Sequence, residues 1–140
     1  MKKVLNLTQH QATQEQIKDG VIDLRPELQR ELKHLLNFGV PPTTKEIMDR
    51  VNAIYRIVVE EITGKRIGDE NYDKVINEAI DGVMVGGAMW LIPALVEDLQ
   101  NATTVYASFS QRVSEEHVNE NGEVIKTSRF KHIKLVEIPL

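Results

Sequence analysis

A histidine close to the amino terminus could act on a phosphate-containing ligand. His10 follows a short apolar segment, residues 3–8, and is preceded by Thr8 and Gln9. An imidazole at the end of a strand can act as a general acid or base near neutral pH, or can donate a hydrogen bond to a phosphate. Thr8 and Gln9 are expected to supply further hydrogen bonds to such a ligand. The alternative is a loop histidine that faces water.

A basic segment near the carboxyl terminus is the second candidate. Residues 125–134 carry cationic side chains without an acidic one among them, namely Lys126, Arg129, Lys131 and Lys134. With Arg112 they could neutralise several phosphates, and we expect ligand contacts from Arg112, Arg129 and Lys131. Two alternatives remain open: the charges protect an edge strand from aggregation, or they pair with glutamates across the strands.

His132 lies within this basic segment, two residues after Phe130. It is either a second acid or base, or a structural histidine held by a backbone carbonyl. The chain has four histidines and no cysteine, and the histidines show no metal-ligand spacing. We therefore expect no metal site, and no cofactor is implied.

Two glycines and two serines complete the set of candidate ligand-binding residues. Gly86 and Gly87 separate an apolar strand expected over 82–85 from a helix expected over 88–100. Their amides could face an anion at the start of that helix, although close packing of the helix on the sheet explains them equally well. The pair lacks the complete dinucleotide-binding fingerprint. Ser108 and Ser110 end a strand expected over 103–110.

The remaining elements must bring these residues together. Thr13 and Gln16 form a capping box at the start of a short helix, and Pro26 suits the first turn of a second one. A long amphipathic helix is expected over 45–63, because apolar residues recur there every three or four positions. Asn121-Gly122 predicts a two-residue type I′ hairpin between two long strands. The helix over 88–100 contains Pro93, which would kink it or, alternatively, mark a break and a restart.

Strands that alternate with helices predict an α/β fold: one domain spanning 1–140, with a Rossmann-like, mainly parallel sheet, helices on both faces and a long C-terminal antiparallel β-hairpin. Ligands of such sheets bind beyond the carboxyl ends of the strands, which here carry the candidate residues at 8–10, 86–87 and 108–110.

The composition limits the partners. The net charge of −4 and pI of 5.6 argue against binding long duplex nucleic acid, which requires a basic domain. No apolar run has the length of a membrane span, and the first residues lead into a strand and not into a signal peptide. A cytoplasmic protein with no membrane partner is therefore expected.

Taken in order, the motifs resemble the small CRISPR-associated ring-nuclease-like proteins, which are related to the CRISPR-associated Rossmann fold of antiviral defence. The resemblance covers both ends of the chain and not residues 23–81. The matching residues are His10, Thr13, Glu15 and Gln16; Gly86, Gly87 and Ala88; Val105, Tyr106, Ala107 and Arg112; and Glu116, Gly122, Phe130 and His132.

The resemblance implies a homodimer that binds a cyclic oligoadenylate messenger, or another small phosphate ligand, at the strand ends. It further implies metal-independent cleavage, in which a ribose 2′-hydroxyl attacks the neighbouring phosphodiester and leaves a 2′,3′-cyclic phosphate. His10, Arg112 and His132 are the catalytic candidates carried over. Two alternatives stay open: a sensor or sponge that binds without cleavage, and a phage or bacterial interaction protein of unknown function.

Overall fold

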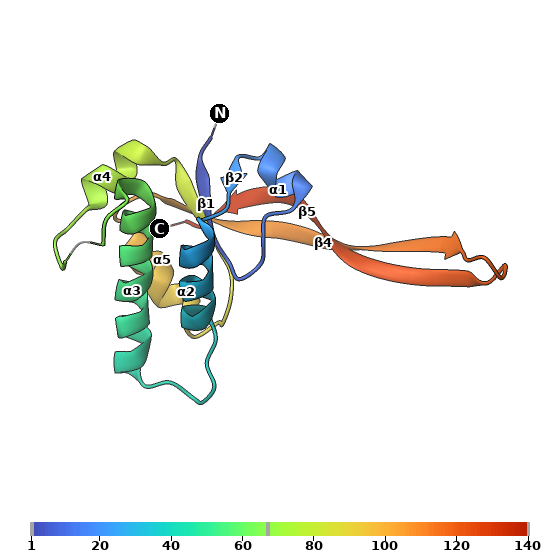
Figure 1. Cartoon of the computed structure of the whole chain (residues 1–140), viewed down its shortest axis with the longest axis horizontal. Helices are drawn as coiled ribbons and strands as arrows, with labels where there is room; N and C mark the ends of the chain where they lie inside the picture. The colour runs from blue at the N-terminus through green and yellow to red at the C-terminus, as the bar shows by residue number, and fades with distance from the viewer. Residues whose placement is uncertain (1, 67, 140) are drawn as a thin grey trace.

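A computed structural model describes residues 2–66 and 68–139 (Figure 1). Five strands form one sheet in the order β2-β1-β3-β4-β5. They are β1 (Val4–Leu7), β2 (Val21–Ile22), β3 (Gly82–Val85), β4 (Thr104–Val118) and β5 (Val124–Glu137). The β2–β1, β1–β3 and β3–β4 pairs are parallel, and only β4–β5 is antiparallel among the described strands. The expected mixed α/β fold, with a mainly parallel sheet and a C-terminal hairpin, is confirmed.

Five helices connect these strands: α1 (Gln14–Lys18), α2 (Pro26–Leu36), α3 (Thr44–Thr63), α4 (Asp73–Ala79) and α5 (Ile92–Leu99). The predicted capping box at α1 is confirmed, since Thr13 Oγ1 accepts from the Gln16 amide and Gln16 Oε1 accepts from the Thr13 amide. Pro26 occupies the first turn of α2, where its missing amide costs no hydrogen bond. Within the described residues no helix is both long and apolar enough to cross a membrane.

The two faces of the sheet are covered unequally. On one face, alternate strand residues such as Leu7, Val83 and Val105 are buried with apolar side chains of α2, α3, α4 and α5. Each such side chain contributes about 1.5–3 kcal/mol when fully buried. On the other face the buried set is small and includes Val4 and Met84. There α1 contacts β5 and β2 but buries none of its own residues completely. The second face is therefore covered by a five-residue helix and remains open near the strand ends.

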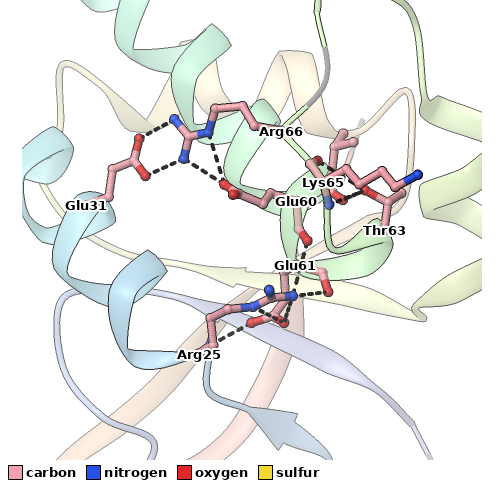
Figure 2. Close-up of polar contacts among 8 residues, drawn as sticks. Arg25, Glu31, Glu60, Glu61, Thr63, Lys65 and Arg66 are labelled. Carbon is pink, nitrogen blue, oxygen red and sulfur yellow. Dashed lines mark hydrogen bonds and ion pairs between the residues drawn. The ribbon is translucent and has the colours of Figure 1, made fainter.

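Ion pairs hold α2 and α3 together at one end (Figure 2). Arg66 follows α3 and lies 2.6 Å from a carboxylate oxygen of Glu31 in α2 and of Glu60 in α3. Arg25, just before α2, pairs with Glu61 and donates to the backbone carbonyls of Glu60 and Glu61. Those carbonyls belong to the last turn of α3, where the Glu60 carbonyl also accepts from the Gly64 amide, at 2.7 Å, and Arg25 supplies a further donor to both.

The helix expected over 88–100 begins later than predicted. Residues 88–91 form turns, and α5 begins at Ile92 with Pro93 in its first turn. Both expectations, a kink within a helix over 88–100 and a break with a restart, are therefore wrong, because no helix precedes Ile92 in this segment. Proline fits there because its ring would clash inside a helix but costs nothing in the first turn.

The hairpin lies where predicted, but its turn differs. Five residues, 119–123, connect β4 to β5, and the only positive φ angle in that connection belongs to Gly122, at 77°. A type I′ turn requires positive φ at Asn121 as well, so that prediction is wrong. The Asn119 side chain closes the loop instead, because its Oδ1 accepts from the amides of Asn121 and Glu123. The outer parts of β4 and β5 pair with each other and form a two-stranded ribbon that projects away from the helices (Figure 1). This ribbon and its connecting loop, residues 110–131, are here called the arm.

Candidate functional site

A cleft of about 570 Å³ opens at the carboxyl ends of β1 and β3 and beside the first half of β4, on the face that carries α1. The prediction that a strand ends at Ser110 is wrong, because β4 continues to Val118 in its antiparallel pairing with β5. This volume is within the range of small-molecule sites, roughly 300–1,000 Å³. The cleft is lined by Thr8, Gln9, His10, Gln11, Thr13, Gln16, Met84, Val85, Gly86, Gly87, Ala107, Ser108, Ser110, Phe130 and His132. Eight of the eleven residues predicted for the site are among them, and they follow β1 and β3 or lie within β4 and β5.

The first wall of the cleft is built on a buried asparagine. Asn6 is 4% exposed, and its Oδ1 accepts from both the amide and the hydroxyl of Thr8. Its Nδ2 donates to the His10 carbonyl at 2.7 Å and to Asp23 Oδ1 at 2.9 Å. These bonds fix the backbone of the turn after β1, while the His10 side chain itself is exposed. The His10 imidazole thus lies at the exposed rim of the cleft, where it can contact a ligand that enters from solvent without rearrangement of the backbone.

The glycines of the second wall are explained by packing. A Cβ added to Gly86 would lie 3.3 Å from Thr8 Cγ2, and Gly87 has a φ of 145°, which side chains rarely adopt. The prediction that these glycines open a helix is wrong, because α5 begins five residues after Gly87. Their amides therefore have no adjacent helix dipole to assist anion binding. Gly86 leaves room for the Thr8 side chain, and both glycines line the cleft without side chains of their own.

The third wall contains a chain of hydrogen bonds through His132. His132 Nδ1 lies 2.5 Å from Ser108 Oγ, and Nε2 lies 2.7 Å from Asp19 Oδ2. Ser108 Oγ is also 2.9 Å from Ser110 Oγ. The His132 side chain is 1% exposed, so a ligand in the cleft would reach it mainly through Ser108. His132 was expected to be either a reactive group or a structural histidine bonded to a backbone carbonyl; its partners are instead a carboxylate and a hydroxyl.

The cationic candidates lie outside the cleft, on the arm. Arg112 stacks over the ring of Phe130, with 5.5 Å between its guanidinium carbon and the ring centroid. Phe130 lines the cleft, so Arg112, which lies over the Phe130 ring, is next to the outer end of the cleft. The register pairs Arg112 with Phe130 and Ser110 with His132, so these four side chains alternate onto one face of the ribbon. A ligand that extends out of the cleft along this face would meet Arg112 first.

Arg129 is engaged by acidic neighbours. Arg129 lies 3.6 Å from a carboxylate oxygen of Glu15 and 3.4 Å from one of Glu115. A backbone hydrogen bond lowers the pKa of Glu15, and the positive charges of Arg129 and Lys131 lower it further. Lys126 pairs with Glu116 across the ribbon. The alternative in which the basic residues pair with glutamates is thus confirmed for Arg129 and Lys126. Arg112 is therefore the stronger candidate for contact with a bound ligand.

Three residues of the site were not predicted from the sequence, for different reasons. Gln16 was predicted as a helix cap and matched in the family resemblance but not as a ligand contact, yet it lines the cleft and its Nε2 donates to Ser108 Oγ at 3.5 Å. Asn6 carried a weak signal, as a polar residue inside an apolar strand. Asp19 carried none, because its partner His132 is 113 residues away. Among the described residues no group of three or more potential ligands is arranged to hold a metal ion.

Comparison with known proteins adds a family but no activity. No curated protein and no solved structure matches the chain. One family model, that of the uncharacterized protein MJ1673 family, matches residues 2–136, which include every residue of the cleft. The chain therefore belongs to the uncharacterized protein MJ1673 family.

Proposed function

We propose that this is a cytoplasmic protein with a Rossmann-like sheet, which binds a cyclic oligoadenylate in the strand-end cleft and cleaves it without a metal ion. The observation that carries the proposal is the meeting of His10, Ser108 and His132 in one cleft beside the carboxyl ends of the parallel strands β1 and β3. Ligands of open α/β sheets bind at this position. The family of CRISPR-associated ring-nuclease-like proteins, which the ordered motifs resemble, supplies the ligand class.

The chemistry requires alignment and proton transfer. The ribose 2′-hydroxyl would attack the adjacent phosphorus, the bond to the 5′-oxygen would break, and a 2′,3′-cyclic phosphate and a free 5′-hydroxyl would result. A base must accept the proton of the attacking hydroxyl, and an acid must protonate the leaving oxygen. The His132–Ser108 pair, on the inner wall, suits the first role, and His10, at the rim, suits the second. Arg112 would stabilise the charge that develops on the phosphate.

A ring of several nucleotides exceeds a cleft of about 570 Å³, which supports a homodimer in which two clefts share one ring. Large apolar side chains on the arm are exposed and are available to such an interface. They include Val118, Val124 and Phe130, at 67%, 63% and 69% exposure. A two-stranded ribbon with no further cover is marginally stable in water, so burial of these side chains would stabilise it.

Binding without cleavage is the second candidate. One observation favours it: the His132 side chain is only 1% exposed, and its Nδ1 is already bonded to Ser108 Oγ. A sensor or sponge would need the cleft and Arg112 but no proton transfer. An interaction protein that uses the exposed arm, without any nucleotide, is a third reading of the same surface.

The experiment is incubation of the purified protein with cyclic tetra-adenylate or hexa-adenylate in EDTA, followed by separation of the products. Linear products that end in a 2′,3′-cyclic phosphate support cleavage. Intact rings, together with a raised melting temperature in the presence of the ligand, support binding alone. Intact rings with no thermal shift contradict both and favour the interaction protein.

A further inference from the structure

The hydrogen bonds around His132 form a chain in which the donor and the acceptor of each bond can be assigned. A carboxylate oxygen can only accept, so the bond to Asp19 Oδ2 requires the proton to lie on His132 Nε2. The neutral ring then presents Nδ1 as an acceptor, and the Ser108 hydroxyl must donate to it. With its proton directed at the ring, Ser108 Oγ accepts from Ser110 Oγ. Asp19, His132 and Ser108 thus have the relation of orienting acid, base and nucleophile in serine hydrolases.

The strand register produces this arrangement. A bulge between Phe109 and Ser110 shifts the pairing by one residue, so that Ser110 and not Gln111 lies opposite His132. Ser108 and Ser110, which alternate onto one face of β4, therefore flank the imidazole from the neighbouring strand. Bulges are frequent next to active sites, where they redirect a side chain.

The environment separates the base from solvent and exposes the nucleophile. The His132 side chain is 1% exposed, whereas Ser108 is partly exposed and lines the cleft. A donor for a developing oxyanion lies beside them: Gln16 Oε1 is occupied by the Thr13 amide, which directs Nε2 toward Ser108 at 3.5 Å. Side-chain amides fill this role in several acyl-transfer enzymes.

We propose that Ser108 is an activated nucleophile and that the cleft hydrolyses a small carboxylic ester that carries a negative charge. Ser108 Oγ would bond to the ester carbon while its proton passes to His132 Nδ1. The bond to the alkoxide would then break, the imidazolium would protonate the leaving oxygen, and water would release the acid from the acyl-serine. Asp19 is a positioning residue. Arg112, on the same ribbon face as Ser110, would attract the charged end of the substrate. This proposal does not depend on binding of a cyclic oligoadenylate.

The test uses a fluorophosphonate probe, which traps activated serines, on the full chain. We expect one adduct per chain, located on Ser108 by peptide mapping. Ser108→Ala should abolish labelling, whereas Ser114→Ala, at an exposed position of β4 outside the cleft, should retain it within a few-fold, each with an unchanged circular dichroism spectrum. No adduct, an adduct on another residue, or equal labelling of S108A would overturn the proposal.

Two further comparisons separate catalysis from a structural tether between β5 and α1. With a p-nitrophenyl ester, Asp19→Asn should lower kcat by about 100-fold or more and leave KM unchanged, and Asp19→Glu should recover part of the loss. A fall in melting temperature without a fall in kcat would show a tether only and overturn the role of Asp19. Mono-p-nitrophenyl succinate should be hydrolysed at least about tenfold faster than the neutral butyrate ester, the ratio expected for about 1.4 kcal/mol of charge attraction. Equal rates would overturn the charged substrate.

Discussion

His132 Nε2 in β5 lies 2.7 Å from Asp19 Oδ2, at the residue that ends α1, and so joins the last strand to the first helix. The contact closes one side of the cleft. It also connects the edge strand β5 to α1, the helix that covers the thinly covered face of the sheet.

Replacement of His132 by alanine should lower the free energy of unfolding by about 2–3 kcal/mol. The change removes a buried ring and two hydrogen bonds, one of them to a charged group. Urea unfolding followed by circular dichroism measures the loss. His34→Ala, at an exposed position of α2, is the matched control and should change stability by less than about 0.5 kcal/mol. Equal stability of the two variants would show that the contact does not hold β5 in solution.

His10→Ala should slow cleavage of cyclic oligoadenylate by about 100-fold or more, the usual contribution of a positioned acid or base, without loss of binding. Its side chain is exposed, so the fold should be unaffected. Product analysis and a binding titration are made in parallel, again with His34→Ala as the control. Similar losses for both histidines would exclude a specific role for His10.

Arg112→Ala should weaken nucleotide binding and reduce its dependence on salt by about 0.7 in the slope of log K against log salt, the value for one phosphate contact on a single strand. Lys126→Ala is the control, because Lys126 pairs with Glu116 farther out on the arm. Binding measured by fluorescence anisotropy at several salt concentrations gives both slopes. An unchanged slope for R112A would mean that the arm does not contact phosphate.

Asp98→Asn should stabilise the protein at neutral pH by about 1 kcal/mol. Burial raises the pKa of Asp98, the negative charge of Asp73 adds to this, and Asp98 Oδ2 is buried without a hydrogen-bond partner. Since the folded state holds this proton more tightly than the unfolded chain, stability falls as the pH rises from the ordinary carboxyl pKa through the raised one. Thermal unfolding across this pH range should show the fall in wild type and a smaller one in D98N. Identical profiles would contradict the raised pKa.

Tyr55→Phe should cost about 1–3 kcal/mol. The hydroxyl donates to Asp73 Oδ1 at 2.7 Å and accepts from the Tyr72 amide at 2.8 Å, so its loss leaves two partly buried groups without a partner. Burial and the bond to Asp73 raise the pKa of Tyr55 to about 12. In an absorbance titration, Y55F should therefore lose the tyrosinate signal that appears near pH 12. A tyrosinate signal that Y55F leaves unchanged at this pH would assign the transition to another tyrosine.

Local chemistry made several elements predictable from the sequence alone. Thr13 and Gln16 cap α1 because their side chains reach amides three residues away, and the apolar periodicity of α3 follows from the helical repeat. The rule that ligands bind at the carboxyl ends of parallel strands was sufficient to select Thr8, Gly86 and Ser108 as neighbours. Each of these inferences depends on residues close in sequence or on a general property of the sheet.

Only the tertiary structure decided which groups pair. Asp19 with His132, and Glu15 with Arg129, join residues more than a hundred positions apart, and no local pattern encodes such a contact. The bulge between Phe109 and Ser110 likewise could not be predicted from a local pattern, and its one-residue shift in register decides which side chains share a face. The sequence therefore determined which residues reach the strand ends. Packing of α1 against the edge of the sheet decided which of them are free to meet a ligand, since a charge already paired within the fold is unavailable to one.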